Sequence, residues 1–83
     1  MKKAIVYGKY IVADPKICHG KITFKGTRIF VADVLDMVSE GLSWDYIIKQ
    51  WHGNISKEAI SEAIQLGKAF LLKDVQKYKM VIS

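Results

Sequence analysis

Residues 21–41 read KITFKGTRIFVADVLDMVSEG, and the spacing of the apolar residues changes part-way through this stretch. Polar and apolar side chains alternate over residues 21–24, two more apolar residues follow Gly26 at residues 29 and 30, and a glycine readily adopts the positive φ of a tight hairpin turn. The apolar residues then recur at i, i+3, i+4 and i+7, the pattern of a helix that buries one face. The stretch therefore predicts a β-hairpin followed at once by a helix over residues 32–40, which Gly41 ends in a left-handed conformation.

A strand is predicted on the amino-terminal side of this hairpin. Residues 4–12 are rich in β-branched and aromatic side chains, and Gly8 is a point where the strand can be interrupted. Pro15 ends the segment, because proline has no N–H to donate to a strand ladder. Residues 16–20 are expected to form a loop or a single helical turn. Within the hairpin, three apolar side chains are expected to face the core or a partner: Ile22, Phe24 and Ile29.

Two further helices are predicted on the carboxy-terminal side. Ser43 and Ser56 each precede an apolar pattern of helical spacing, and a serine in this place can cap the first turn through its side-chain oxygen. The second helix is expected to end at Gly53 and the third to run to residue 72. Short turns that contain glycine join the three helices, as they do in a helix-turn-helix unit.

The predicted fold class is α+β, mainly α, in a single domain over residues 1–83. A chain of 83 residues has room for only one hydrophobic core. Residues 1–30 form the strand and the β-hairpin, residues 31–72 form the three-helix helix-turn-helix core, and residues 73–83 form a basic tail. Cys18 is the only cysteine, so packing without an internal disulfide must stabilise this fold.

The net charge of +5 conceals an uneven distribution along the chain. Residues 1–28 carry seven basic side chains and one acidic one, residues 29–67 carry six acidic and two basic, and residues 68–83 carry four basic and one acidic. Basic ends favour contact with a polyanion or an acidic partner, although the same charges can simply keep a protein dissolved. No charge-free stretch approaches the length of a membrane span, and the expected compartment is the cytoplasm.

A homodimer is expected from the amino-terminal strand. Its apolar residues fall on both faces of the sheet, and one layer of three helices cannot cover both faces. These residues are Ile5, Tyr7, Tyr10 and Val12. Pairing of two such strands across a twofold axis would cover the exposed sheet edge and the second face together.

Catalytic chemistry is nearly absent from the sequence. Cys18 and His19 are adjacent, and neighbouring side chains on an extended segment point apart, so they make a poor thiolate and imidazole pair. His52 falls in a predicted turn. The cysteine and the histidines lack the repeated spacing of zinc sites, and the glycines form no phosphate-binding loop. We therefore predict neither an enzyme nor a bound metal or cofactor.

Several short motifs together resemble a known protein family. They are Asp14-Pro15-Lys16-Ile17-Cys18-His19-Gly20-Lys21, then Lys25-Gly26-Thr27-Arg28-Ile29-Phe30-Val31, then Glu40-Gly41-Leu42-Ser43 with Ile47-Ile48. The resemblance is to the prokaryotic family called domain of unknown function 433, whose pattern DP-ICGGKP-I-GTRI-V leads from a hairpin into a helix-turn-helix. It covers about residues 10–67. His19 stands here where the family has a glycine, and His52-Gly53 where a proline is common.

The resemblance implies a small antitoxin-like, DNA-binding-type protein, often encoded beside a PIN-like ribonuclease of the toxin class. The leading hypothesis is an antitoxin of a type II toxin-antitoxin system that binds its operator DNA as a dimer and neutralises the ribonuclease. The alternative is a homodimeric protein-interaction module without a DNA role, because Glu58 and Glu62, both predicted on the exposed outer face of the third helix, oppose phosphate contact. An enzyme that uses Cys18 and His19 would need both side chains in one pocket.

DNA contacts are expected from the hairpin and from the third helix. In the hairpin, Lys21, Lys25 and Arg28 would contact phosphates. The exposed face of the third helix supplies the weaker candidates for base reading, which are Ser56, Lys57, Ser61 and Gln65. A structural role for Arg28 is equally open, in which its guanidinium binds backbone carbonyls or Asp33 and fixes the hairpin against the first helix.

The basic tail is the expected toxin-binding segment. Five of its residues are the candidates: Lys73, Lys77, Tyr78, Lys79 and Met80. The resemblance implies a nuclease cleft whose carboxylates hold a divalent metal, and a lysine ammonium placed among them would displace that metal. In the alternative, residues 78–82 add a strand to this protein's own sheet, because their apolar residues alternate.

Overall fold

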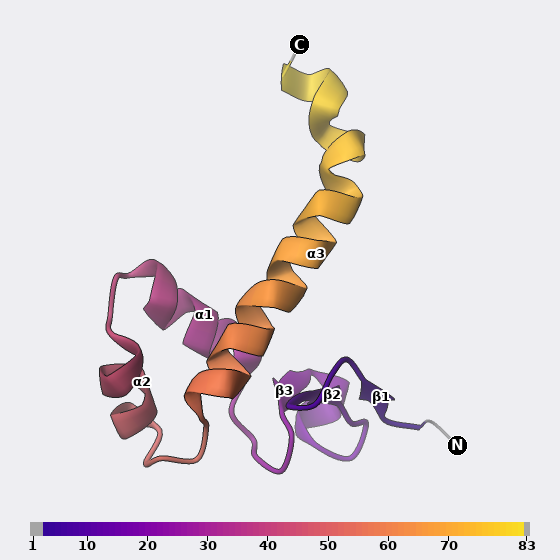
Figure 1. The fold of residues 1–83 in the computed structure, drawn as a ribbon. Coiled ribbons are helices and arrows are strands. Elements are labelled where there is room, and N and C mark those ends of the chain that lie inside the picture. The colour runs from indigo at the N-terminus through magenta and orange to yellow at the C-terminus, as the bar shows by residue number, and fades with distance from the viewer. Residues whose placement is uncertain (1–2, 83) are drawn as a thin grey trace.

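The computed structural model describes the backbone of residues 3–82 and the side chains of residues 3–73. A three-stranded sheet comes first along the chain and three helices follow it (Figure 1). The elements are β1 (Ile5–Val6), β2 (Ile11–Ala13), the 3-10 turn η1 (Cys18–Gly20), β3 (Ile22–Phe24), α1 (Val31–Ser39), α2 (Trp44–Gln50) and α3 (Lys57–Ile82). The predicted α+β fold, mainly helical, is confirmed.

The amino-terminal segment forms two strands where one was predicted. β1 and β2 pair antiparallel, with Val6 opposite Val12. The chain reverses its direction through residues 7–10, so the prediction of one strand over residues 4–12 is wrong. The interruption falls at Gly8, where the sequence allowed it. This reversal places β1 alongside β2, as the edge strand of the sheet.

The predicted hairpin is only partly formed. β3 pairs antiparallel with β2, the strand before it, and the order in the sheet is β1-β2-β3. Between β3 and the predicted second strand, residues 27–30, there is one bridge, from Thr23 to Phe30. The turn itself is as predicted, because Gly26 has a φ of +79°. Residues 16–20 form the expected connection, which contains the single turn η1.

Local signals place the helices correctly. The Ser43 hydroxyl accepts a hydrogen bond from the N–H of Tyr46 at 3.1 Å, and the Ser56 hydroxyl accepts one from the N–H of Ala59 at 3.1 Å. Both serines are therefore N-caps, as predicted. Gly41 has a φ of +83° and follows the end of α1 in the left-handed conformation.

One hydrophobic core lies where α1, α2 and the sheet meet the first half of α3. Its buried residues come from all of these elements and from the turn before α3: Ile11, Phe24, Val31, Val34, Ile47, Ile55, Ala59, Ile60 and Ala63. Ile29 packs against this cluster, so Phe24 and Ile29 face inward as expected. Ile22 does not, because 42% of its surface is exposed.

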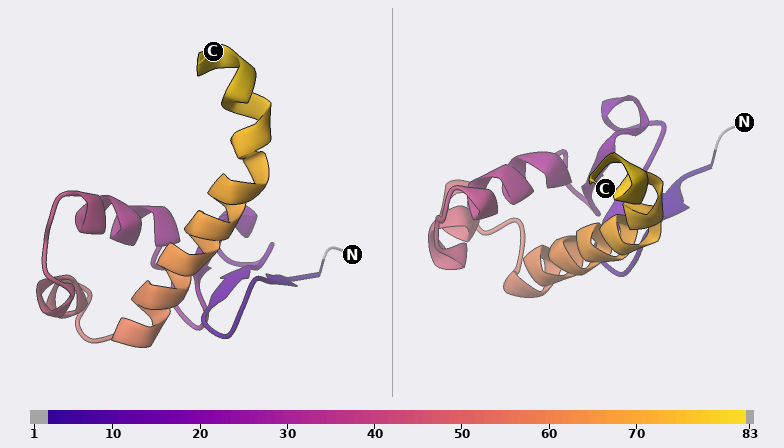
Figure 2. Two further views of the ribbon diagram at one scale, coloured as in Figure 1. Left: turned by 45° about the horizontal axis from the view of Figure 1, so that its top comes forward. Right: turned by 90° about the horizontal axis from the view of Figure 1, so that it is seen from above.

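The last helix is longer than predicted. α3 has 26 residues and continues to Ile82, so the alternative in which residues 78–82 form a strand is wrong. Its first half contacts the body of the molecule, and its second half projects from that body (Figures 1 and 2). We call the projecting part, residues 68–82, the α3 arm. The described side chains of the arm, over residues 68–73, are all exposed.

Candidate nucleic-acid interface

The turn after β3 lies beside the amino-terminal end of α3. Lys25 of this turn and Ser56, the α3 cap, line the same hollow, which has a volume of about 230 Å³ and which we call the Lys25 hollow. Asn54 of the α2–α3 turn also lines it, together with the apolar side chains of Tyr10 and Phe24. Two of the predicted DNA contacts, from distant parts of the sequence, are therefore neighbours at one end of the molecule.

The other two basic residues of the hairpin are placed differently. Lys21 stands at the opposite end of β3 from Lys25 and lines an apolar hollow beside α1. Arg28 is exposed. Within residues 3–73 its guanidinium forms no hydrogen bond or ion pair, so the predicted contacts with backbone carbonyls or Asp33 are not formed. Lys21 and Lys25 therefore line different hollows and do not form one cluster at the end of α3.

The outer face of α3 carries the remaining predicted contacts. Glu58, Ser61 and Gln65 follow one another at spacings of three and four residues, so they lie in one row along the helix. Gln65 is exposed and Ser61 is half-buried. In the first turn, the Nζ of Lys57 lies 3.2 Å from the Oδ1 of Asp45 on α2, and both side chains are exposed. Solvent screens a pair of this kind, so it adds little to stability.

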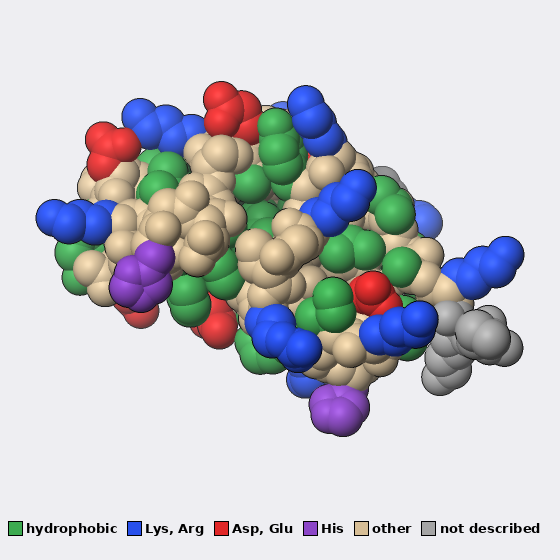
Figure 3. Space-filling view, turned by 90° about the horizontal axis from the view of Figure 1, so that it is seen from below, with side chains coloured by type: hydrophobic (Ala, Val, Ile, Leu, Met, Phe, Trp, Pro, Cys, Tyr) green, Lys and Arg blue, Asp and Glu red, His purple; other side chains and the backbone are tan. Residues whose placement is uncertain are grey.

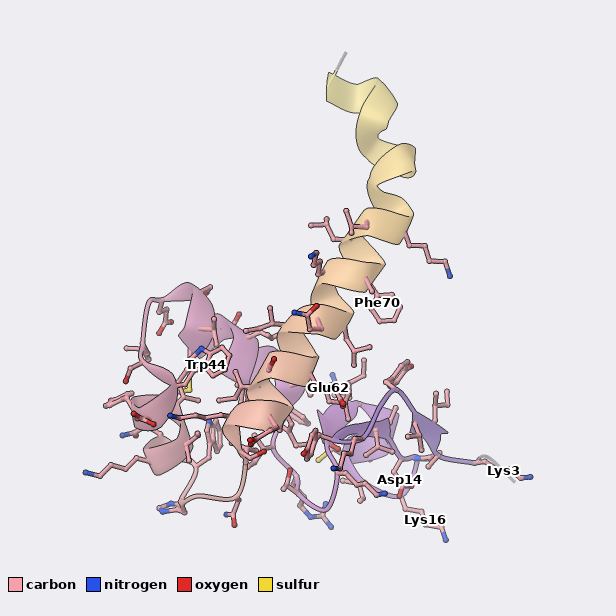
Figure 4. All side chains as sticks on the ribbon, in the orientation of Figure 1. Lys3, Asp14, Lys16, Trp44, Glu62 and Phe70 are labelled. Atoms are coloured by element: carbon pink, nitrogen blue, oxygen red, sulfur yellow. The ribbon has the colours of Figure 1, made fainter. Side chains whose placement is uncertain are left out.

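Glu62 lies on the side of α3 that faces the sheet (Figure 4), and its predicted place on the outer face is wrong. Its carboxylate accepts hydrogen bonds from the backbone N–H groups of Tyr10, at 2.8 Å, and Lys9, at 3.0 Å. Both groups belong to the turn between β1 and β2. Gly8 allows this close approach, because a Cβ there would lie 2.6 Å from the Oε1 of Glu62. We call this contact the Glu62 clamp.

The sequence gives one faint signal for the Glu62 clamp. A glycine inside a β-rich segment often marks a bulge or the close approach of another group, and Gly8 is such a glycine. It does not indicate which group approaches, since Glu62 is 52 residues away from Tyr10 along the chain. The clamp removes one of the two carboxylates that were expected to oppose phosphate contact.

The end of the molecule that carries the Lys25 turn and the α2–α3 turn is viewed from below in Figure 3. Lys and Arg side chains stand at several separate places on this face, and hydrophobic side chains, other uncharged surface and some Asp and Glu side chains lie between them (Figure 3). Positive charge is therefore distributed over the face. Such a distribution suits contacts with several phosphates along a backbone better than a single compact anion.

Comparison with known families gives one result that bears on the whole site. Residues 11–66 match the model of a family described as a protein of unknown function, DUF433. The chain belongs to the DUF433 family. No curated protein and no solved structure matches it. The family match extends from β2 into the first half of α3. In this DUF433 protein, β1 and the α3 arm therefore lie outside the matched residues.

The predicted toxin-binding residues of the DUF433 chain are all on the α3 arm. Lys73 is exposed. The side chains of Lys77, Tyr78, Lys79 and Met80 lie outside the described residues. The backbone that carries them is helical, as part of α3.

The candidate catalytic side chains of the DUF433 chain do not converge. Cys18 and His19 have positive φ values of 49° and 58°, and the Cys18 Sγ lies 4.0 Å from the carbonyl of Arg28. His19 instead lines a hollow with Pro15. Among the residues that the structure describes, no three His, Cys, Asp or Glu side chains are grouped as a metal site would require, and no helix is both long and apolar enough to cross a membrane.

Proposed function

We propose that this protein is an antitoxin-like, DNA-binding protein of a type II toxin-antitoxin system. It binds its operator DNA as a dimer and neutralises a PIN-like ribonuclease. The DNA part of the proposal is carried by one observation, the position of Lys25 beside the capped amino-terminal end of α3. The nuclease part comes from the family resemblance, which implies a partner of that class.

The arrangement of α2 and α3 supports the DNA role. In a helix-turn-helix unit, the first turns of the second helix enter the major groove and contact base edges. In this chain that helix is α3, and it exposes Lys57 and Gln65. The free N–H groups at a helix amino terminus favour phosphate, and Lys25 adds a positive charge at the same end. The Glu62 clamp supports the proposal further, because its carboxylate is turned toward the sheet.

Substitution of Lys25 tests the DNA role. We expect Lys25→Ala to weaken binding of DNA from upstream of the gene and to lower the slope of log K against log salt by about 0.9, the value for one lost phosphate contact. Lys21→Ala is the matched control, because it removes the same charge at the other end of β3. Fluorescence anisotropy over a series of salt concentrations measures the DNA affinity and the salt slope of each variant. Equal slopes for the two variants and the wild type would contradict the placement of DNA beside α3.

An interaction module without a DNA role remains the second candidate. One observation favours it: Phe70, Leu71 and Leu72 on the α3 arm are large apolar residues that are at least half exposed. Such a cluster is typical of a protein-binding surface. The two functions differ in their prediction for DNA. A protein that inhibits its nuclease but shows no salt-dependent binding to any DNA would be an interaction module.

A further inference from the structure

An uncovered apolar depression runs beside α1. Two hollows, with volumes of about 130 and 440 Å³, share the lining residues Ile22, Val31 and Leu35 and therefore lie next to each other. Phe70 of α3 lines the first hollow, and Phe30, just before α1, lines the second. We call this depression the α1 groove. It explains where the exposed Ile22 side chain lies, since Ile22 is part of its wall.

The α3 arm carries apolar side chains that the same chain leaves uncovered. Phe70, Leu71 and Leu72 are 50%, 67% and 60% exposed. Consecutive residues of a helix point in directions about 100° apart, so these three cover more than half of its circumference. The ring of Phe70, labelled in Figure 4, contacts the body, because its centroid lies 6.4 Å from that of Tyr7. Leu71 and Leu72 need a partner from elsewhere.

The two surfaces carry opposite charges. Asp33, Asp36 and Glu40 are exposed and follow the spacing i, i+3 and i+7, so they form an acidic row along the helix that lines the α1 groove. No basic residue occurs within α1. The described part of the arm carries Lys68 and Lys73, both exposed, and no acidic residue. A basic, apolar helix therefore complements the acidic row and the groove beside it.

The arm cannot cover the acidic row of its own chain. α3 is one continuous helix, and its second half rises away from α1 in Figure 1 and in the left view of Figure 2. The edge strand β1 offers a poorer contact between copies, because it has only two residues and so few backbone groups to pair. A second copy of the chain supplies a basic arm and an acidic groove in equal number.

We infer that the α3 arm of each copy docks in the α1 groove of a second copy, in a homodimer with twofold symmetry. Each dimer then contains the same contact twice, which is the property of a closed isologous interface. Leu71 and Leu72 occupy the groove, and Lys68 and Lys73 face the acidic row. This inference rests on the dimer of the proposed function, and it moves the contact from β1 to α1 and α3.

Two charge-reversed variants of the full chain test this inference. The first variant has an acidic arm, through Lys68→Glu and Lys73→Glu. The second has a basic row on α1, through Asp33→Lys and Asp36→Lys. Each variant alone places like charges together in both contacts. We therefore expect the dissociation constant of its dimer to be at least tenfold higher than that of the wild type. An equal mixture should recover the affinity of the wild type, because a heterodimer joins opposite charges in both contacts. Sedimentation velocity measures all four samples.

Two results of the mixing experiment would contradict the inferred dimer contact. A mixture that dimerises no better than either variant alone, or variants that dimerise as well as the wild type, would overturn the inference. Circular dichroism melting verifies that the variants are folded, and all the substituted residues are exposed. The measurement uses neither DNA nor nuclease, so its outcome is independent of whether the protein binds an operator.

A second pair of variants separates the arm from the sheet edge. Leu71→Glu with Leu72→Glu should yield the 9.4 kDa monomer at concentrations where the wild type is a dimer. Ile5→Glu with Val6→Glu makes the same change on two exposed apolar residues of β1, and should leave the dimer intact. The reverse result would place the dimer contact at β1 and overturn the inference, while the proposed DNA-binding dimer would stand.

Discussion

Glu62 satisfies two backbone N–H groups of the β1–β2 turn, and hydrogen bonds to a charged acceptor are among the stronger ones. We expect Glu62→Ala to lower the free energy of unfolding by about 2 kcal/mol, because both N–H groups lose their partner. For a chain of this size that change lowers the melting temperature by about 10 °C. Thermal melting followed by circular dichroism measures it. Glu58→Ala, on the outer face of the same helix, is the matched control and should change the melting temperature little.

The glycine of the turn provides an independent check on the Glu62 clamp. Gly8→Ala places a Cβ 2.6 Å from the Glu62 Oε1, so the carboxylate has to move away from the turn. The same substitution should cost much less in a Glu62→Ala background, where no carboxylate is displaced. Effects of neighbouring residues that share a contact are not additive. Additive losses of stability in this double-mutant cycle would show that the clamp does not hold the sheet to α3.

At the scale of an element, Ser56 caps α3 and is also a candidate DNA contact, and a comparison of two substitutions can separate these roles. Ser56→Ala removes the α3 cap, and we expect it to cost about 1 kcal/mol of stability. Ser43→Ala removes the equivalent cap of α2, at a distance from the Lys25 hollow, and should cost a similar amount. Ser56→Ala alone should also weaken DNA binding, measured by anisotropy well below both melting temperatures. Equal DNA affinities of the two variants would restrict Ser56 to its capping role.

The helices could be predicted from the sequence because their signals are local. Ser43, Ser56 and Gly41 act within one turn of the residues that they cap or end, so a short window contains the whole interaction. The length of α3 was underestimated, since nothing in the apolar spacing after residue 72 separates a helix from an alternating strand. The described backbone shows that the helix pattern prevails to Ile82.

The sheet and part of the site could not be predicted, because they depend on contacts between distant residues. β3 could pair with the segment after it or with β2, and the alternation of side chains is the same in both cases. Lys25 and Ser56 were both candidate DNA contacts, but only the folded chain places them beside one hollow. Glu62 has the spacing of an exposed helical residue, so no local pattern reveals that a turn 52 residues away binds it.

The whole molecule divides into a body and an arm at about the place where the family match ends. The match stops at residue 66, and the side chains from residue 67 to residue 73 are exposed. The body holds the core, the Lys25 hollow and both helix caps, which are the features that the DNA role requires. The described side chains of the arm are apolar or basic and all exposed, and apart from the contact of Phe70 with Tyr7 they are available to other molecules.

Removal of residues 73–83 tests the nuclease role of the arm at this scale. The shortened chain keeps Leu71 and Leu72 and therefore the apolar part of the inferred dimer contact, and it keeps the whole body. We expect it to dimerise and to bind DNA, but to lose inhibition of the PIN-like ribonuclease that we propose as its partner. Lys73→Ala with Lys77→Ala in the full chain is the matched variant, which removes two charges and leaves the helix length unchanged.

The proposed mechanism of inhibition also predicts a dependence on Mg²⁺. A lysine ammonium among the carboxylates of a nuclease cleft replaces the charge of the divalent metal, so excess Mg²⁺ should compete with it and restore nuclease activity. Inhibition by the full chain should therefore weaken as the Mg²⁺ concentration rises. When the inhibitor is the variant with Lys73→Ala and Lys77→Ala, the same recovery of nuclease activity should occur at a lower Mg²⁺ concentration. RNA cleavage by the purified nuclease measures both effects. A shortened chain that is folded by circular dichroism and inhibits as well as the full chain would show that the tail is not the inhibitor and that the charge-replacement mechanism is wrong.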